Sequence, residues 1–202
     1  MIIEHQFKTK SHDLCDLFSK TNKMSTFKAK VERQANQNIQ DYPYNDYVGD
    51  AFEFLVELII KLHPVDNRLG ITNYTPVQLD DNGVDGYGIN MDGENCAVQV
   101  KFRGDVTSTL SATKDHLDSF INESQHKLRG KFVPMLYTTE KGCPRHYIFT
   151  TNEGLHHYTE GVKFEGYKIQ VFGFNQLRRM LDNNYLFWDK CREIVKLNYK
   201  SC

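Results

Sequence analysis

Hydrophobic side chains recur at helical spacing most clearly between residues 46 and 63. Apolar positions return there every three to four residues, which is typical of a helix that buries a wide face. His63-Pro64 predicts the end of this helix. Weaker helical spacing over residues 1–45 predicts one or two helices packed on the edge of the domain. The stripe of the main helix consists of Val48, Ala51, Phe52, Leu55, Val56, Ile59 and Ile60.

Alternation of apolar and polar residues predicts β-strands after residue 70. Residues 96–102 alternate most clearly, so Val98 and Val100 face one way while Gln99 and Lys101 face the other. Further strands are expected over residues 74–79, 84–90, 132–139, 146–151 and 167–172, and helices over residues 111–128, 174–183 and 185–198. Pro76 indicates an edge position or a bulge. The order of elements predicts an α/β fold with a central mixed β-sheet flanked by helices.

The chain divides at the polar stretch DYPYND, residues 41–46. A length of 202 residues suits one domain with an appendage. We therefore expect an N-terminal helical appendage over residues 1–45 and a main domain with C-terminal helices over residues 46–202.

Composition excludes several classes of protein. Hydrophobic residues make up 40% of the chain, which argues against full disorder. No apolar run approaches the length of a membrane span, and the N-terminus lacks the pattern of a secretion signal, so no membrane partner is expected. The five cysteines are scattered without a CxxC pair, which argues against a disulfide framework. We expect a cytoplasmic protein in a reducing compartment.

Charge is balanced overall, at −1, but unevenly distributed. Residues 45–99 carry ten acidic and two basic side chains, whereas residues 1–44 have a net charge of +2 and residues 100–202 of +5. One interpretation is a solvated acidic face. The other is that some acidic groups converge on a cation while the flanking bases face a polyanion.

The spacing of Asp85, Gln99 and Lys101 helps to decide between a solvated acidic face and a cation site. A lysine in a strand interior is costly to bury unpaired, so Lys101 predicts a nearby anion. A two-residue loop at Asp92-Gly93 would place Asp85 opposite Val100. A three-residue loop over residues 91–93 places Asp85 opposite Gln99, on the same face, and Gly93 suits the left-handed position of such a loop. We predict the three-residue loop.

These residues form a set of oxygen ligands that suits a hard divalent cation such as Mg²⁺ or Mn²⁺. Asp85 and Glu53 supply carboxylates, Gln99 a side-chain carbonyl and Val100 a backbone carbonyl. Lys101 would orient or deprotonate a metal-bound water, or neutralise charge on a phosphate. The set predicts hydrolysis of phosphodiester bonds.

Three short motifs resemble the PD-(D/E)xK nuclease superfamily. They are GDAFE at residues 49–53, VDGYG at 84–88 and QVK at 99–101, and the Q-x-K variant is similar to Mrr-type restriction endonuclease domains. The resemblance covers about residues 46–151. It implies a restriction-endonuclease-like fold with a four-stranded mixed sheet, dependence on a divalent metal and cleavage of DNA.

By position, the resemblance makes Asp85 the motif aspartate, Gln99 the residue at the acidic position, Lys101 the motif lysine and Glu53 the helix glutamate. The chain departs from the parent pattern because no proline precedes Asp85 and because Gln99 replaces a carboxylate. The second departure leaves one fewer negative charge for the metal.

Each residue also has an ordinary structural interpretation. Glu53 can be a solvated residue at the margin of a buried helix, Asp85 a turn residue, and Lys101 a side chain that reaches water from a strand end. Their joint occurrence favours the nuclease site.

Polar residues after the third strand are candidates for holding a DNA backbone. They are Arg103, Thr107, Ser108, Thr109, Ser111 and Lys114. An ordinary capped loop is an equal alternative. His146 and His156-His157 have no acidic or cysteine partner at ligand spacing, so structural histidines are favoured. Solvated Arg178-Arg179 and a core Trp188 are expected.

The sequence therefore predicts a metal-dependent deoxyribonuclease, a phosphodiester hydrolase that uses a metal-activated water. One alternative is a non-catalytic DNA-binding or partner-binding module that retains the nuclease fold, and another is a nuclease centred on His156 or His157. A homodimer is plausible because cleavage of both strands needs two sites or two events. The fold does not choose among restriction, repair, junction resolution and homing.

Overall fold

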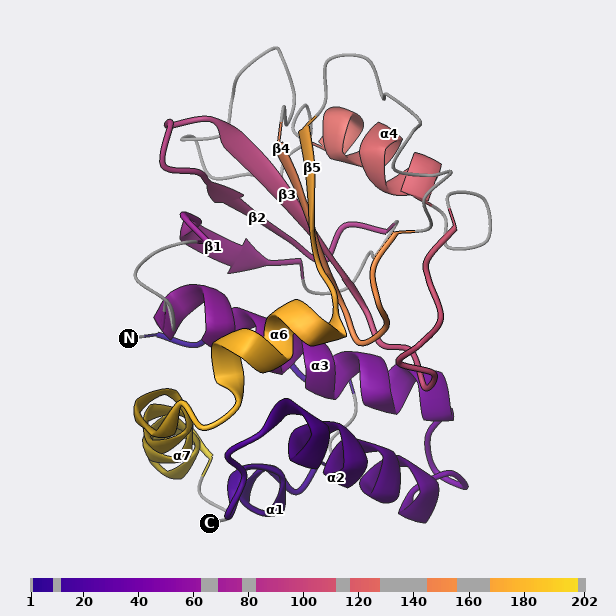
Figure 1. Ribbon diagram of the computed structural model, residues 1–202, viewed down its shortest axis with the longest axis vertical. Coiled ribbons are helices and arrows are strands. Elements are labelled where there is room, and N and C mark those ends of the chain that lie inside the picture. The colour runs from indigo at the N-terminus through magenta and orange to yellow at the C-terminus, as the bar shows by residue number, and fades with distance from the viewer. Residues whose placement is uncertain are drawn as a thin grey trace.

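The computed structural model describes residues 2–8, 12–62, 69–77, 83–111, 117–127, 145–155 and 168–199. Its centre is a five-stranded mixed sheet in the order β1-β2-β3-β4-β5 (Figure 1). The strands are β1 (Thr72–Pro76), β2 (Gly86–Ile89), β3 (Asn95–Lys101), β4 (Arg145–Thr150) and β5 (Lys168–Phe172). The first three run antiparallel, and β4 and β5 run parallel to β3. The predicted α/β class with a mixed sheet is confirmed.

Helices lie on both sides of this sheet (Figure 1). They are α1 (Leu14–Phe18), α2 (Met24–Gln37), α3 (Tyr44–Leu62), α4 (Leu117–Lys127), α6 (Phe174–Leu181) and α7 (Tyr185–Asn198). Strong apolar periodicity predicted α3, and the two C-terminal helices α6 and α7 were also predicted, each to within two residues at both ends. The predicted strand over residues 132–139 and the N-terminal part of the helix predicted from residue 111 lie largely outside the described residues.

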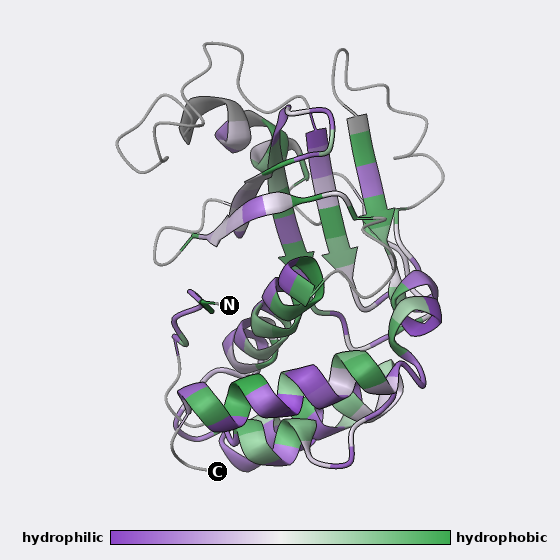
Figure 2. Ribbon diagram, turned by 90° about the vertical axis from the view of Figure 1, so that its left-hand side faces the viewer, coloured by the Kyte–Doolittle hydropathy of each residue, from purple (hydrophilic) through white to green (hydrophobic). Residues whose placement is uncertain are grey.

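Two hydrophobic cores lie on the two faces of β3. Val98 and Val100 belong to the larger core, which α3 covers, whereas Ala97 belongs to a smaller core with Phe120 of α4. Successive side chains of a strand point to opposite faces, which explains the division. Figure 2 shows hydrophobic and hydrophilic residues interspersed along both the strands and the helices. The alternation predicted for β3 is confirmed, although the strand is buried on both faces except at its last residue.

The first two helices contribute to the larger core. Leu17, Met24, Phe27 and Val31 are fully buried there, in the same cluster as Trp188 of α7. The sequence had instead predicted that these helices pack at the edge of the domain. Their burial was underestimated because weak periodicity carries little information about how deeply a helix is buried. Residues on both sides of position 45 share this core, and the predicted domain boundary stays a prediction.

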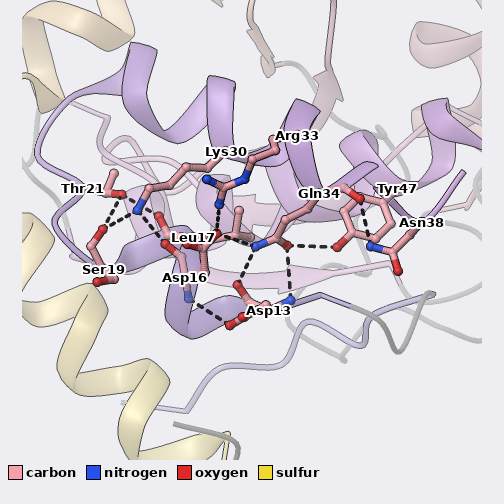
Figure 3. A network of polar contacts seen from close by, with 10 residues as sticks. All are labelled: Asp13, Asp16, Leu17, Ser19, Thr21, Lys30, Arg33, Gln34, Asn38 and Tyr47. Atoms are coloured by element: carbon pink, nitrogen blue, oxygen red, sulfur yellow. Dashed lines mark hydrogen bonds and ion pairs between the residues drawn. The ribbon is translucent and has the colours of Figure 1, made fainter. Parts of the chain in front are cut away.

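A network centred on Gln34 of α2 joins the first three helices (Figure 3). Its Oε1 accepts hydrogen bonds from the Asp13 N–H (3.2 Å) and the Tyr47 hydroxyl (3.0 Å). Its Nε2 donates to the Asp13 carbonyl (3.0 Å) and to the Asp16 carboxylate (2.9 Å). A buried amide is stable only when its polar atoms are paired, so this network fixes α1 against α2 and α3.

The structure bears on two expectations from the sequence, the state of the cysteines and the lack of a membrane span. Cys96 and Cys191 are free and buried, and burial raises the pKa of the Cys96 thiol to about 12. Cys15 is disulfide-bonded, whereas the sequence argued against a disulfide framework. Over the described ranges, no helix has both the length and the apolar character that a membrane span requires.

Two glycines give opposite expectations for stability. A Cβ at Gly86 would lie 2.4 Å from the hydroxyl oxygen of buried Tyr74, whereas a Cβ at Gly49 in α3 would meet no atom within 4 Å. Gly86→Ala should lower the free energy of unfolding by about 1–3 kcal/mol through overpacking. Gly49→Ala should raise it by up to about 1 kcal/mol, because alanine favours a helix interior. Urea unfolding measures both, and a neutral Gly86→Ala would contradict the packing at Tyr74.

Candidate active site

The turn between β2 and β3 sets the positions of the candidate residues. Asn90 N–H donates to the Glu94 carbonyl (2.9 Å), which leaves residues 91–93 as a three-residue loop. Gly93 has φ +76°, the left-handed conformation that glycine adopts without strain. Both features confirm the loop that the sequence predicted.

The regular pairing that follows from this loop ends at Gly86, which lies opposite Val98. A regular continuation would place Asp85 opposite Gln99, but Asp85 also bonds to Val98, so the ladder is irregular at this residue. The Asp85 N–H donates to the Val98 carbonyl (2.9 Å), and the Asp85 Oδ2 accepts from the Val100 N–H (2.5 Å). The carboxylate is therefore bonded to the backbone of β3 beside Gln99.

Gln99 is fully buried and only partly satisfied. Its Nε2 donates to the Gly83 carbonyl (2.8 Å), but its Oε1 has no hydrogen-bond partner in the described part of the chain. Leaving a buried acceptor unpaired is costly, so such atoms are rare in native proteins. Among the described residues, this amide oxygen therefore keeps an unused capacity to accept a hydrogen bond or to bind a cation.

Lys101 ends β3, two residues beyond Gln99 and on the same face, and its side chain is partly buried. The sequence predicted an anion near this lysine. No described carboxylate forms an ion pair with its ammonium group, so the described residues do not supply that anion.

Glu53 lies on α3, which packs against the Val98 and Val100 face of β3 rather than the Gln99 face. Its side chain is 16% exposed, and its Oε1 lies 3.5 Å from the ammonium nitrogen of Lys8. The structure therefore bonds the Asp85 carboxylate to Val100 and the Gln99 amide to Gly83, and it places Glu53 on the helix that covers the Val98 and Val100 face.

Tyr74 of β1 connects these acidic groups electrostatically. Burial raises the pKa of the Tyr74 hydroxyl well above its usual value, and the negative charges of Asp85, Glu57 and Glu53 raise it further. These carboxylates therefore act on one buried phenol, although they come from β2 and from two turns of α3.

Sequence reasoning singled out Glu53 of α3 but did not predict the partners of Asp50, Glu53 and Glu57, which follow one another at helical spacing. Asp50 and Glu57 are buried, and the segment from Ile2 to Lys8 supplies contacts to all three. Oxygen or nitrogen atoms of His5, Asp50 and Glu53 lie within 4.8 Å of one another. Acidic residues at helical spacing within an otherwise apolar helix could have indicated that Asp50 and Glu57 are buried and need partners.

The loop after β3 satisfies much of its own polarity. The Asp105 carboxylate accepts from the Thr107 N–H (2.9 Å) and hydroxyl (2.7 Å), and the Ser108 hydroxyl donates to the Asp105 carbonyl (2.9 Å). The Arg103 guanidinium donates to the Phe102 carbonyl (2.9 Å). These bonds favour the capped-loop alternative for Thr107 and Ser108. Lys114 lies outside the described residues, and contact with DNA stays a prediction.

The histidine alternative is not tested at His156-His157, which lie outside the described residues. His146 is fully buried on β4, with its Nε2 2.7 Å from the Ser124 hydroxyl and its ring edge-on to Phe120. Burial lowers the pKa of its imidazole to about 4. His146 is therefore a neutral structural residue at pH 7, as the sequence favoured. Trp188 is buried and Arg178 exposed, as expected.

Comparisons with protein-family models, with curated proteins and with solved structures give no match to this chain.

The lowered pKa of His146 predicts how stability depends on pH. The unfolded chain binds a proton at this imidazole near pH 6.5, whereas the folded chain binds it only near pH 4. The free energy of unfolding should therefore fall by up to about 3 kcal/mol as the pH drops from 6.5 to 4. Urea unfolding at several pH values should show a weaker dependence for His146→Gln. An identical dependence in both proteins would contradict this assignment.

Proposed function

We propose that this chain is a divalent-metal-dependent DNA endonuclease of the restriction-endonuclease-like fold, which hydrolyses phosphodiester bonds. One observation carries the proposal. Asp85 is bonded to Val100 of β3, next to Gln99, whose buried amide oxygen has no partner among the described residues. Lys101 follows on the same face as Gln99, and no described carboxylate pairs with it.

The order of the elements supports the finer fold assignment. The long buried helix α3 is followed by three antiparallel strands, then by α4, then by β4 parallel to β3. The sheet has five described strands where the resemblance implies four, because β5 pairs with β4 at the parallel edge.

The ligand chemistry fits Mg²⁺ or Mn²⁺. Asp85 would hold the cation with a carboxylate, Gln99 with its unpartnered amide oxygen and Val100 with its backbone carbonyl, and all three are hard oxygen ligands. Glu53 would add a second carboxylate from α3. A bound divalent cation supplies a polarised water and neutralises charge on the phosphate.

The chain's own residues have separate roles in this proposal. The hydrogen bond from the Val100 N–H holds the Asp85 carboxylate in one orientation. The Lys101 ammonium binds a non-bridging phosphate oxygen and opposes the negative charge that develops during attack. The chain would act as a homodimer where both strands of a duplex are cut.

The test is a cleavage assay with plasmid DNA and Mg²⁺. Asp85→Asn, which keeps an acceptor for the Val100 N–H, and Lys101→Ala should each lower the cleavage rate at least about 100-fold. Lys190→Ala, on the exposed surface of α7, is the matched control and should cleave normally. A chelator should stop cleavage by the unchanged protein.

Undiminished cleavage by either site variant would overturn the proposal. Binding of DNA without metal-dependent nicking, over duplex, nicked, branched and single-stranded substrates, would favour the non-catalytic module instead. Circular dichroism of each variant checks that the fold is retained.

A further inference from the structure

The first residues of the chain lie along α3 and run in the opposite direction to it. The N-terminus lies beside the C-terminal end of α3 (Figure 1), where the Lys61 ammonium donates to the Ile2 carbonyl (3.0 Å). One turn earlier, Glu57 accepts from the N–H groups of Glu4 (2.8 Å) and His5 (2.9 Å). We call residues 2–8 the N-terminal strap.

Two histidines anchor the strap and the residues that follow it to Asp50. The Asp50 carboxylate has no exposed surface, and its two oxygens lie 2.9 Å from His5 Nε2 and 3.0 Å from His12 Nε2. Asp13, directly after His12, is bonded to Gln34 (Figure 3). Buried carboxylates are costly unless they are paired, so Asp50 and Glu57 hold the strap firmly.

The cluster of His5, Asp50 and Glu53 has the residue types of a metal site, but its contacts have another explanation. Both oxygens of Asp50 already engage imidazole nitrogens. The ammonium group of Lys8 already lies beside Glu53. The protein's own donors and cations therefore balance these carboxylates.

The pair of Lys8 and Glu53 differs from the buried anchors. The Lys8 side chain is 32% exposed and the Glu53 side chain 16% exposed, and their charged atoms are 3.5 Å apart. A partly exposed pair of this kind is weak and opens readily. The strap thus places the Lys8 ammonium group beside Glu53. Of the three acidic residues Asp50, Glu53 and Glu57, Glu53 is the one with appreciable exposure.

We propose that the N-terminal strap is an autoinhibitory contact in which Lys8 competes with a divalent cation for Glu53. The inference rests on the proposed function, because it takes Glu53 as a ligand of the catalytic metal. An ammonium group beside Glu53 repels a divalent cation and occupies an oxygen that the cation would use. Metal binding therefore requires that the pair open, while Asp50 and Glu57 keep the strap in place.

The experiment measures binding of Mn²⁺ alone to the full chain, by titration calorimetry without DNA. Lys8→Gln should bind Mn²⁺ about two- to five-fold more tightly, the range expected for loss of a partly exposed ion pair. Lys8→Arg, which keeps the charge, should bind as the unchanged protein does. Lys190→Gln, which removes an exposed charge on α7, controls for net charge and should leave the affinity unchanged.

The double variant Lys8→Gln/Glu53→Gln shows whether the effect passes through Glu53. In the Glu53→Gln background, Lys8→Gln should no longer tighten binding. The inference is overturned if Lys8→Gln binds Mn²⁺ as the unchanged protein does, if Lys190→Gln tightens binding equally, or if the unchanged protein binds no Mn²⁺. Absence of DNA cleavage with normal Mn²⁺ binding would instead count against the proposed function and leave this competition standing.

Discussion

The register of the hairpin between β2 and β3 is the constraint on which the candidate site depends. A shift by one residue would turn Gln99 and Lys101 toward α3 and place Val98 and Val100 against α4, which would mismatch both cores. The three-residue loop at 91–93 and the division of the two cores specify the same register. Because loop and core agree on one register, the face on which Gln99 lies follows from the folding of the sheet.

Helix α3 imposes a second constraint, which concerns charge. The helix is buried on most sides, yet it carries Asp50, Glu53 and Glu57 in a single stripe. Buried carboxylates require donors or cations, and the chain supplies them from its first residues and from His12. The three carboxylates therefore differ in exposure: Asp50 and Glu57 are buried and held by the strap, whereas Glu53 is partly exposed. This difference in exposure distinguishes Glu53 from the two carboxylates that the strap holds in the interior.

Predictability from sequence varied with the range of the interactions involved. Long apolar periodicity predicted α3 closely, because burial of one helix face repeats along the chain itself. The hairpin register could also be predicted, since Gly93 and the alternation of β3 limit the choice of loop. The burial of α1 and α2 was underestimated, because their stripes are short and their partners lie on α3 and α7. The pairing of His5 and His12 with Asp50 joins residues about 40 positions apart, which no local pattern reveals.

The sequence by itself determined the class of the fold, the three-residue loop between β2 and β3, and the face on which Gln99 and Lys101 lie. These features depend on alternation, helical spacing and turn chemistry, all of which act between neighbours in the chain. Only the tertiary structure decided that Glu53 lies on the helix covering the opposite face of the sheet, that Lys8 pairs with it, and that the Gln99 amide oxygen is buried without a described partner. Such properties depend on which distant side chains approach and how much water they exclude, and that is settled only when the whole core packs.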